Sequence, residues 1–232
     1  MSGFRHEYKY VCSLEKMEYI KSSVSALLEM DLYAKEQSGY VVRSVYFDDY
    51  YDTCFKENMY GVDPREKFRI RIYNADSSKI NLELKKKQRG KTKKISCTLT
   101  KGVCEEILQG GVPDMSAIDS ALYRKFYSQM QMKRMVPKII VEYDRVPYIY
   151  KDGNVRITFD KNIRSSIQYS NFFKKDLFFR PVMEINKHLI EIKYDEILPD
   201  FIDQMVSHED LRQNSFSKYF LCRKYSLGGN IG

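Results

Sequence analysis

Residues 65–73 read REKFRIRIY, and their alternation is the strongest indication of the fold. Lys67, Arg69 and Arg71 alternate with three hydrophobic residues. In a β-strand this pattern places the cations on one face and the hydrophobic side chains on the other. The cations then lie about 6–7 Å apart along the strand, close enough to repel one another. The cationic face therefore either lies in solvent or faces a strongly anionic group.

Other segments show the same division into a charged and a hydrophobic face. The charged faces carry Arg5, Glu7 and Lys9; Asn81, Glu83, Lys85 and Lys87; Tyr143 and Arg145; Arg156; and Glu191 and Lys193. For any one strand, a sheet with one face in solvent is the ordinary explanation. Across five or six strands it is less suitable, because cations dominate and like charges opposed across strands are destabilising. The pattern favours a barrel with its charged faces inward, and eight strands leave room for side chains or one small ligand.

Turn residues and helix caps divide the rest of the chain. We predict strands over 4–11, 39–48, 67–73, 79–87, 92–99, 136–145, 155–160, 181–186 and 189–194, the last two as a pair. We predict helices over 14–30, 52–60, 117–133, 199–207 and 217–227, with Ser13 capping the first and Ser116 or Asp119 the third. Strands in meander order with helices interposed indicate an α+β fold, an antiparallel eight-stranded β-barrel with helices packed outside. No linker interrupts the sequence, so we predict a single domain over 1–232.

Composition limits the classes of binding partner and the cellular location that we expect. The formal net charge of +8 favours an anionic partner. The first ten residues lack the pattern of a signal peptide, and no segment approaches the ~20 apolar residues of a membrane span. The five cysteines show no metal or redox spacing, and we expect free thiols and a cytoplasmic location. Nucleic acid is not expected, because its binders spread basic residues over an exterior patch.

An inward ring of cations needs an anion, or interspersed glutamates, to compensate it. A chain of phosphates fits, because arginine offers bidentate forks for phosphate oxygens and lysine adds point charges. A glutamate facing the same cavity suits a divalent metal, since Mg²⁺ takes one or two carboxylates together with substrate phosphates. Neither of the common glycine-rich phosphate loops occurs in the sequence.

Seven short motifs occur in the order found in the VTC (vacuolar transporter chaperone) polyphosphate polymerase domain, and the chain resembles that family from Phe4 to Tyr225. The motifs are RHEYKY (5–10), KFRIR (67–71), LELKKK (82–87), VEYDR (141–145), VRITFD (155–160), IEIKY (190–194) and FSKY (216–219). The family belongs to the triphosphate tunnel metalloenzymes, so the resemblance implies an antiparallel eight-stranded tunnel. It also implies transfer of the γ-phosphoryl group of ATP to a growing polyphosphate chain, with Mn²⁺ or Mg²⁺ as the cofactor.

The resemblance also implies roles for individual residues. Phosphate binding during catalysis is implied for Lys9, Arg69, Arg71, Lys85, Lys94, Arg145, Arg156 and Lys218, and substrate contacts for Tyr143 and Ser217. Glu191 is the implied metal ligand. Hydrolytic and cyclase members of the superfamily begin with E-x-E-x-K, whereas here Arg5 takes the first carboxylate position and leaves Glu7 as a second candidate ligand. This departure favours the polymerase branch.

The basic stretch KKKQRGKTKK at 85–94 adds further candidates. Strand parity favours Lys94 over Lys93 as a tunnel residue, but the end of a hairpin can reverse parity, so both are retained. Lys87 and Lys67 are candidate substrate contacts, with Lys67 near the tunnel mouth. The stretch could also be a solvated turn, guide an emerging polyanion or contact an acidic membrane surface. Family members often work beside membrane proteins, so a separate membrane-protein partner is a further possibility.

Two alternative functions remain open. A tunnel triphosphatase would use the same cations to hydrolyse tripolyphosphate or a nucleoside triphosphate. A non-catalytic sensor of polyphosphate or inositol phosphates would keep the basic ring without a usable metal carboxylate, and Glu191 argues against it. No general base is evident, because His6, His188 and His208 are expected outside the site. The sequence does not predict the oligomeric state.

Overall fold

The computed structural model describes residues 3–34, 39–206 and 211–228. Its strands are β1 (His6–Cys12), β2 (Glu29–Met30), β3 (Tyr40–Asp48), β4 (Arg65–Tyr73), β5 (Asp76–Gln88), β6 (Lys91–Leu99), β7 (Val136–Tyr150), β8 (Val155–Ser166), β9 (Arg180–Pro181) and β10 (His188–Tyr194). Its α-helices are α1 (Leu14–Leu27), α2 (Thr53–Met59), α3 (Lys101–Leu108), α4 (Ala121–Lys133), α5 (Asp200–Val206) and α6 (Lys218–Ser226).

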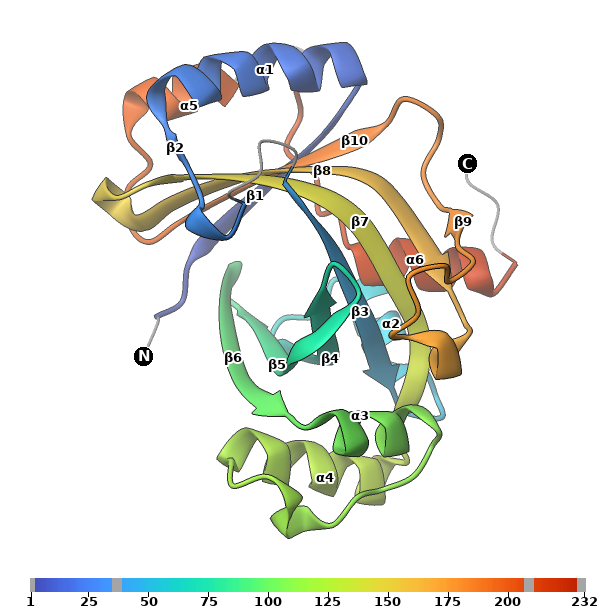
Figure 1. Cartoon of the computed structure of the whole chain (residues 1–232). Helices are drawn as coiled ribbons and strands as arrows, with labels where there is room; N and C mark the ends of the chain where they lie inside the picture. Colours follow the sequence, from blue (N-terminus) through green and yellow to red (C-terminus); the bar gives the residue numbers. More distant parts are fainter. Residues whose placement is uncertain (1–2, 35–38, 207–210, 229–232) are drawn as a thin grey trace.

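Eight of the strands form one antiparallel path, β1-β10-β8-β7-β3-β4-β5-β6, with β2 added to β7 and β9 to β8. The sheet curls until its two edge strands approach each other (Figure 1). Arg5, just before β1, pairs with Thr92 of β6 through two backbone hydrogen bonds of 2.8 Å. In the described part of the chain the edges are bridged at this pair, so the barrel is joined at one point. The predicted α+β fold, an antiparallel eight-stranded barrel, is confirmed.

Two tight hairpins fix the register of the cationic strands. Asn74 and Ala75 join β4 to β5 with φ of 51° and 55°, and Arg89 and Gly90 join β5 to β6 with φ of 51° and 76°. Two successive residues with positive φ are typical of a type I′ turn, whose twist matches the strands that it connects. The register that results sets Lys85 opposite Lys94 and Glu83 opposite Arg69.

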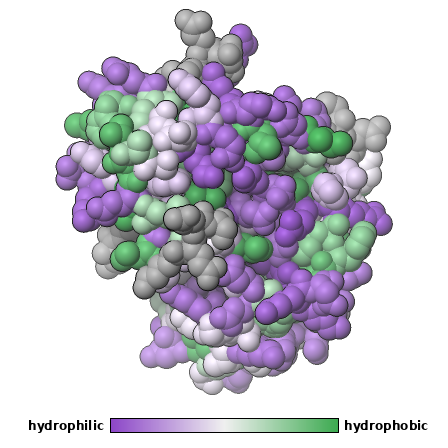
Figure 2. All heavy atoms as spheres, turned by 45° about the horizontal axis from the view of Figure 1, so that its top comes forward, coloured by the Kyte–Doolittle hydropathy of each residue, from purple (hydrophilic) through white to green (hydrophobic). Residues whose placement is uncertain are grey.

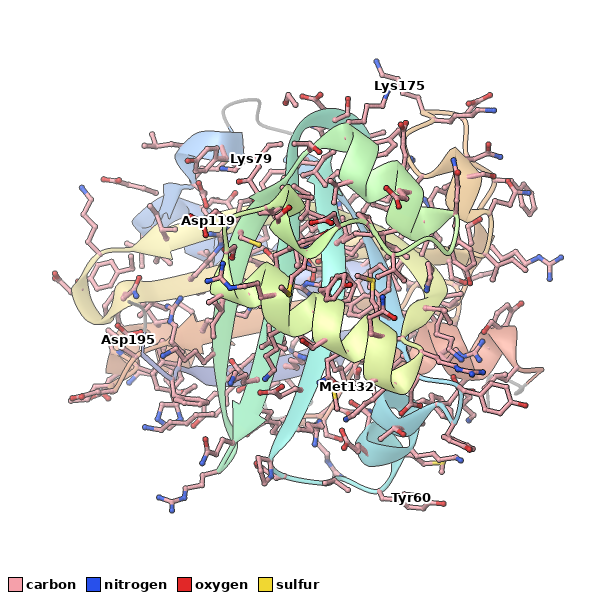
Figure 3. All side chains as sticks on the ribbon, turned by 90° about the horizontal axis from the view of Figure 1, so that it is seen from below. Tyr60, Lys79, Asp119, Met132, Lys175 and Asp195 are labelled. Carbon is pink, nitrogen blue, oxygen red and sulfur yellow. The ribbon has the colours of Figure 1, made fainter. Side chains whose placement is uncertain are left out.

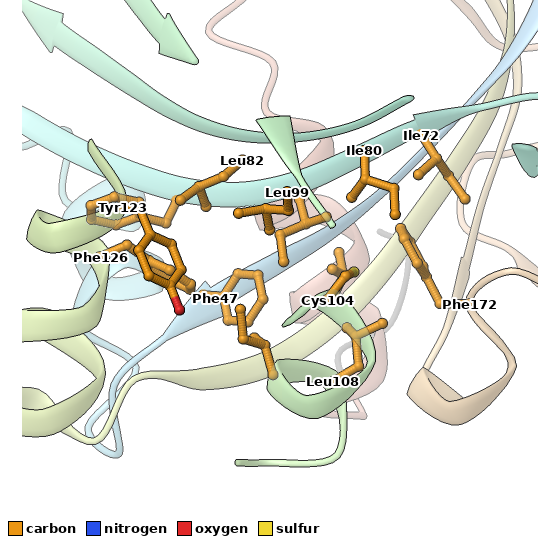
Figure 4. Packing of buried hydrophobic residues seen from close by; sticks show 14 of the residues in the cluster. Phe47, Ile72, Ile80, Leu82, Leu99, Cys104, Leu108, Tyr123, Phe126 and Phe172 are labelled. Carbon is orange, nitrogen blue, oxygen red and sulfur yellow. The ribbon is translucent and has the colours of Figure 1, made fainter. Parts of the chain in front are cut away.

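The hydrophobic faces of the strands point outward, where helices cover them. Helices α3 and α4 lie across β4, β5 and β6 when the molecule is seen from below (Figure 3). Leu82 and Leu99 of the sheet pack there against Leu108 of α3 and Phe126 of α4, all of them buried (Figure 4). Helices α1 and α5 cover β1, β8 and β10 on the other side (Figure 1).

Helix α6 lies at one end of the barrel, beside α2. Its buried Tyr219 and Cys222 pack against Val141 and Tyr143 of β7, which alternate with the outward residues and so share the face of Arg145. The hydroxyl of Tyr219 donates a 2.6 Å hydrogen bond to the carboxylate of Asp48 at the end of β3. Helix α6 therefore presents its first residues to the interior of the barrel.

One face of the molecule is mainly polar. On the face shown in Figure 2, hydrophilic residues predominate and hydrophobic residues form small separate groups. None of the helices within residues 3–34, 39–206 and 211–228 has the length and hydrophobicity to cross a bilayer; the longest, α1, has 14 residues.

Several predicted boundaries are wrong. The first helix ends at Leu27, because Leu28 is extended and the next two residues form β2 against the end of β7. The cap of α4 is Ser120, whose hydroxyl accepts from the backbone N–H groups of Leu122 and Tyr123. The predicted cap Ser116 belongs instead to a short 3₁₀ turn. Helix α3 was not predicted.

The segment 181–186 was predicted as a strand paired with 189–194, and this is wrong. Only Arg180–Pro181 is extended and paired, and its partner is β8. Asn186 has a φ of 66°, and the Lys187 N–H donates to the Glu184 carbonyl in a turn. Strand β10 pairs with β1 and β8 instead. Residue 207 of the predicted helix 199–207 lies outside the described residues.

Candidate functional site

The inward faces of the strands surround a cavity of about 620 Å³. Ligand pockets typically have about 300–1,000 Å³, so the cavity is large enough for a small polyanion. Among the described residues, fourteen cationic side chains line it: Arg5, Lys9, Arg65, Lys67, Arg69, Arg71, Lys85, Lys87, Lys93, Lys94, Arg145, Arg156, Lys193 and Lys218. The carboxylates among the lining residues are Glu7 and Glu191. With Tyr143 and Ser217, all fifteen residues predicted for the site lie around this one cavity, and their roles stay predictions.

The cavity follows strand β4 for its full length. Arg65, Lys67, Arg69, Arg71 and Tyr73, the alternate residues of the strand, all line it. Nine residues in a strand extend over about 27 Å. The cationic surface is therefore elongated, as a linear chain of phosphates would require.

A buried carboxylate compensates the two arginines of β4. The carboxylate of Glu83 on β5, 1% exposed, lies 2.6 Å from Arg69, 3.8 Å from Arg71 and 3.1 Å from Lys94 of β6. Burial opposes ionisation of Glu83, but Arg69 and Arg71 outweigh it and hold its pKa well below the ordinary value. The like charges in REKFRIRIY are thus partly balanced from within the protein.

A second carboxylate compensates the lysines of β5, β1 and β10. The carboxylate oxygens of Glu7 accept from Lys85 Nζ at 2.6 and 2.9 Å, and Lys9 and Lys193 lie 3.6 and 3.4 Å away. Burial opposes ionisation of Glu7, but the attraction of Lys85, Lys9 and Lys193 holds its pKa well below the ordinary value.

The third group joins β7, β8, β10 and α6. Arg145 donates to both oxygens of Asp160 at 2.6 and 2.7 Å and to Glu191 at 3.3 Å. Lys218 Nζ, at the start of α6, lies 2.6 Å from Asp160 and 2.6 Å from Glu191. Burial disfavours the ammonium of Lys218, but Asp160 and Glu191 raise its pKa above the ordinary value. Lys218 therefore stays charged, and its charge is shared between two carboxylates.

Polar contacts around the cavity hold three of the predicted residues, Arg156, Lys9 and Ser217. Arg156 forms an ion pair with Asp31 at 2.7 Å and donates to the Tyr40 hydroxyl at 3.0 Å. Lys9 Nζ donates to the Phe216 carbonyl at 2.8 Å. The Ser217 hydroxyl accepts from the Phe220 N–H and caps α6.

The structure shows which of Lys93 and Lys94 points into the barrel, a question that strand parity did not settle. Lys94 lies opposite Lys85 and forms an ion pair with Glu83, as expected of an inward residue. Lys93 lies opposite Lys86, and its ammonium is 6.0 Å from the centre of the Phe4 ring. Both side chains nevertheless reach the lining of the cavity.

Lys67 is one of the cavity lysines whose pKa burial lowers; Lys85 is another. Its ammonium donates to the side chain of Asn58 at 2.5 Å and lies 5.1 Å from the centre of the Tyr219 ring. Burial lowers the pKa of Lys67 to about 7, and Arg65 adds to the effect. A phosphate bound beside Lys67 would favour the ammonium and raise this pKa again.

We therefore expect tripolyphosphate to bind with proton uptake near neutral pH. The protonated fraction of a group with a pKa of 7 falls about tenfold between pH 6 and pH 8, so this contribution to affinity weakens about tenfold as pH rises. Calorimetry at several pH values, in buffers of different ionisation enthalpy, measures the affinity for tripolyphosphate and the number of protons taken up on binding. In Lys67→Met the affinity for tripolyphosphate should fall about tenfold less between pH 6 and pH 8 than in the wild type. The same fall in both proteins would show that Lys67 is not the group that takes up the proton.

The carboxylates limit how a metal could be held. Within the described residues there is no group of three or more His, Cys, Asp or Glu side chains arranged to hold a metal ion. Glu7 and Glu191 lie near each other, because Lys193 Nζ is 3.4 Å from each. Two carboxylates with phosphate oxygens make a set that Mg²⁺ commonly uses. The residues therefore fit a metal that is held jointly with a phosphate ligand.

Sequence reasoning missed several residues that shape the site. Glu83 and Lys193 were predicted to lie on the inward charged faces but were given no role in the site, whereas Asp160, which shares the strand parity of Arg156, was not named and could have been added by parity alone. Arg65 starts β4 two residues before the predicted boundary. The segment 213–216 also lines the cavity, but it has no regular pattern that could reveal it.

The described histidines lie away from the cavity, as predicted. The His6 ring stacks on Tyr194 at 4.8 Å between ring centres, on the opposite face of β1 from Glu7. His188 is also absent from the residues that line the cavity. His208 lies outside the described residues.

Comparisons with known proteins found one matching family model and several similar solved structures. A family model described as "VTC domain" matches residues 4–227. None of the curated proteins matches the chain. Among solved structures, a protein described as "a putative adenylate cyclase" from Bacillus halodurans has a TM-score of 0.50 and 15% identity, covering 82% of this chain and 79% of its own. A protein from Pyrococcus horikoshii has a TM-score of 0.48 and 14% identity, covering 93% and 97%. At 15% identity the first likeness concerns the fold alone.

Proposed function

The chain belongs to the VTC domain family, and we propose that it is a polyphosphate polymerase of the triphosphate tunnel type, using ATP as the donor. The observation that carries the proposal is the cavity itself. Fourteen cationic side chains, with few carboxylates among them, line an elongated space inside the barrel. A chain of phosphates is the ligand whose shape and charge suit such a surface.

The proposed reaction is a direct transfer. A terminal oxygen of the polyphosphate chain attacks the γ-phosphorus of ATP, the bond from that phosphorus to the bridging oxygen breaks, and ADP leaves with the electron pair. The terminal phosphate oxygen is already ionised at neutral pH, so the attack needs no strong base. This agrees with the absence of the described histidines from the lining of the cavity.

The protein would contribute positioning and electrostatic stabilisation, which supply most of the catalysis in phosphoryl transfer. Arg69, Arg71 and Arg145 offer planar forks to phosphate oxygens, and each is already oriented by a carboxylate on a neighbouring strand. Lys218 would add a point charge from the start of α6. A divalent metal held by Glu191, with Glu7 beside it, would neutralise charge on the phosphate oxygens.

ATP and inorganic polyphosphate are the proposed ligands, and Mn²⁺ or Mg²⁺ the proposed cofactor. The cytoplasmic location and the separate membrane-protein partner stay predictions. Tunnel triphosphatase activity is the alternative that shares the same residues, and the products formed from ATP separate the two activities.

We expect the purified protein, incubated with ATP and Mn²⁺, to produce long phosphate chains that gel electrophoresis resolves by size. A polyphosphate-specific phosphatase should remove them, and a reaction without metal should contain none. Orthophosphate as the sole product would sink the polymerase proposal in favour of hydrolysis. Binding of tripolyphosphate without any turnover would favour the sensor.

A further inference from the structure

The two carboxylates that line the cavity belong to a square of alternating charges on neighbouring strands. Glu7 of β1 lies opposite Lys193 of β10, and Lys9 of β1 lies opposite Glu191 of β10. The four side chains point to the same face, because positions two apart in a strand share a face. The glutamates therefore occupy one diagonal of the square, and the lysines occupy the other.

Lys193 is the lysine of this square that forms an ion pair with each of the two glutamates. Its Nζ lies 3.4 Å from an oxygen of Glu7 and 3.4 Å from an oxygen of Glu191. Lys9 approaches Glu7 at 3.6 Å, and its hydrogen bond goes to the Phe216 carbonyl. The ammonium of Lys193 thus stands between the two carboxylates that the proposed function assigns to the metal.

The other contacts of these carboxylates come from the phosphate-binding cations. Glu7 accepts two hydrogen bonds from Lys85, and Glu191 accepts from Lys218 and Arg145. All four oxygens of the pair therefore lie within 3.4 Å of at least one cation. In the absence of phosphate, a divalent ion would have to displace these lysine and arginine side chains from the carboxylates. Each ion pair that it breaks makes the free energy of metal binding less favourable.

Phosphates change this competition. The ammonium of lysine is carried on a flexible four-carbon stem and can turn from a carboxylate to a phosphate oxygen. When phosphates occupy the cavity, Lys193 gains an anionic partner there, as do Lys85, Lys218 and Arg145, and the pair Glu7 and Glu191 is released for a metal that also contacts the phosphates.

We propose that Lys193 is an internal counter-ion that fills the metal position until phosphates arrive, so that metal and phosphate bind cooperatively. The proposal rests on the assignment of Glu7 and Glu191 to the metal in the proposed function. Coupling of this kind is reciprocal, so the metal strengthens phosphate binding by the same factor as phosphate strengthens metal binding. Couplings between sites typically correspond to factors of about 5–150.

The test measures Mn²⁺ affinity in the absence of any phosphate. We expect weak binding to the wild-type protein and binding at least about fivefold tighter to Lys193→Met, the lower limit of a typical coupling. The free Mn²⁺ concentration can be followed by electron paramagnetic resonance, and calorimetry gives an independent value. Lys87→Met is the matched control, because it removes the same charge from the cavity and Lys87 is bonded to neither carboxylate.

The outcomes separate this inference from the proposed function. If Lys193→Met gains no more Mn²⁺ affinity than Lys87→Met, Lys193 is not a counter-ion for the metal position. Lys193→Gln provides a second variant, polar and close in size, should the methionine variant melt at a lower temperature. If the wild-type protein makes no polyphosphate but Lys193→Met binds Mn²⁺ more tightly, the polymerase proposal fails and the counter-ion role stands.

Discussion

Replacing Glu191 by glutamine is expected to reduce ATP-dependent chain synthesis at least about 100-fold, the loss typical when one electrostatic element of an active site is removed. The amide keeps the size of the side chain and removes its negative charge. A metal held jointly with phosphates would lose its main carboxylate. Lys218 would keep Asp160 at 2.6 Å as a partner, so the start of α6 should remain in place.

Binding and turnover should respond differently in Glu191→Gln. The variant removes one negative charge from a cationic cavity, so tripolyphosphate measured in the presence of a chelator should bind as tightly as to the wild type, or more tightly. Calorimetry measures this binding, and product analysis on gels measures synthesis. Glu105→Gln, on the outer surface of α3, is the matched control and should leave both unchanged.

Two results would remove Glu191 from its proposed role. Undiminished synthesis in Glu191→Gln would show that the carboxylate is not a metal ligand during turnover. A parallel loss of tripolyphosphate binding would show that the residue supports the structure of the cavity. Melting curves of the variant and the wild type distinguish this second case from a direct effect on chemistry.

The inner face of the barrel could be predicted from the sequence because strand parity is a local property. In REKFRIRIY every second residue faces inward, and the register of two short hairpins carries this parity to the next two strands. Strand parity also places Arg145, Arg156 and Glu191 on the inner face of the barrel. The resemblance to the VTC family added Lys218, which no strand pattern could have supplied.

The ion pairs inside the barrel could not be predicted, because they depend on how the sheet curls. Lys218 meets Asp160 across 58 positions of sequence, and Lys85 meets Glu7 across 78. Each contact needs the curled sheet, and the first also needs α6 at the end of the barrel. The strand predicted at 181–186 fails for a related reason: a short hydrophobic run does not reveal whether a neighbouring strand is available to pair with it.

Glu83→Gln is expected to lower the free energy of unfolding by about 3–5 kcal/mol in phosphate-free buffer, the usual effect of removing one partner of a buried ion pair. The substitution leaves Arg69 and Arg71 beside each other, 13% and 7% exposed, without the carboxylate that separates their charges. For a protein of this size, each kcal/mol corresponds to about 2–4 °C in melting temperature. Thermal melting followed by circular dichroism measures the shift.

A matched control exists on the opposite face of the same sheet. Glu66 on β4 also lies between two lysines, at 2.9 Å from Lys86 and 2.5 Å from Lys125, but its side chain is 38% exposed. Solvent-exposed ion pairs contribute about 0–1 kcal/mol, so Glu66→Gln should shift the melting temperature by only a few degrees at most. Equal effects of the two substitutions would contradict the role given to Glu83.

The dependence on pH follows from the low pKa of Glu83 in the folded protein. Its pKa is lower folded than unfolded, so the carboxylate stabilises the fold fully above the ordinary glutamate value of about 4.3 and loses this contribution progressively as pH falls below it. The difference in stability between the wild type and Glu83→Gln should therefore narrow below about pH 4. A constant difference down to pH 3 would mean that Glu83 stabilises the fold by packing and not by charge.

Tripolyphosphate should partly rescue Glu83→Gln, because phosphate oxygens can take the place of the missing carboxylate between Arg69 and Arg71. Any ligand that binds only the folded state raises the melting temperature, so the informative quantity is the difference between the two proteins. We expect a larger rise for Glu83→Gln than for the wild type at the same tripolyphosphate concentration. If the rise is equal or smaller, the phosphates do not reach the two arginines, and the inner face of REKFRIRIY serves the structure of the barrel instead of its ligand.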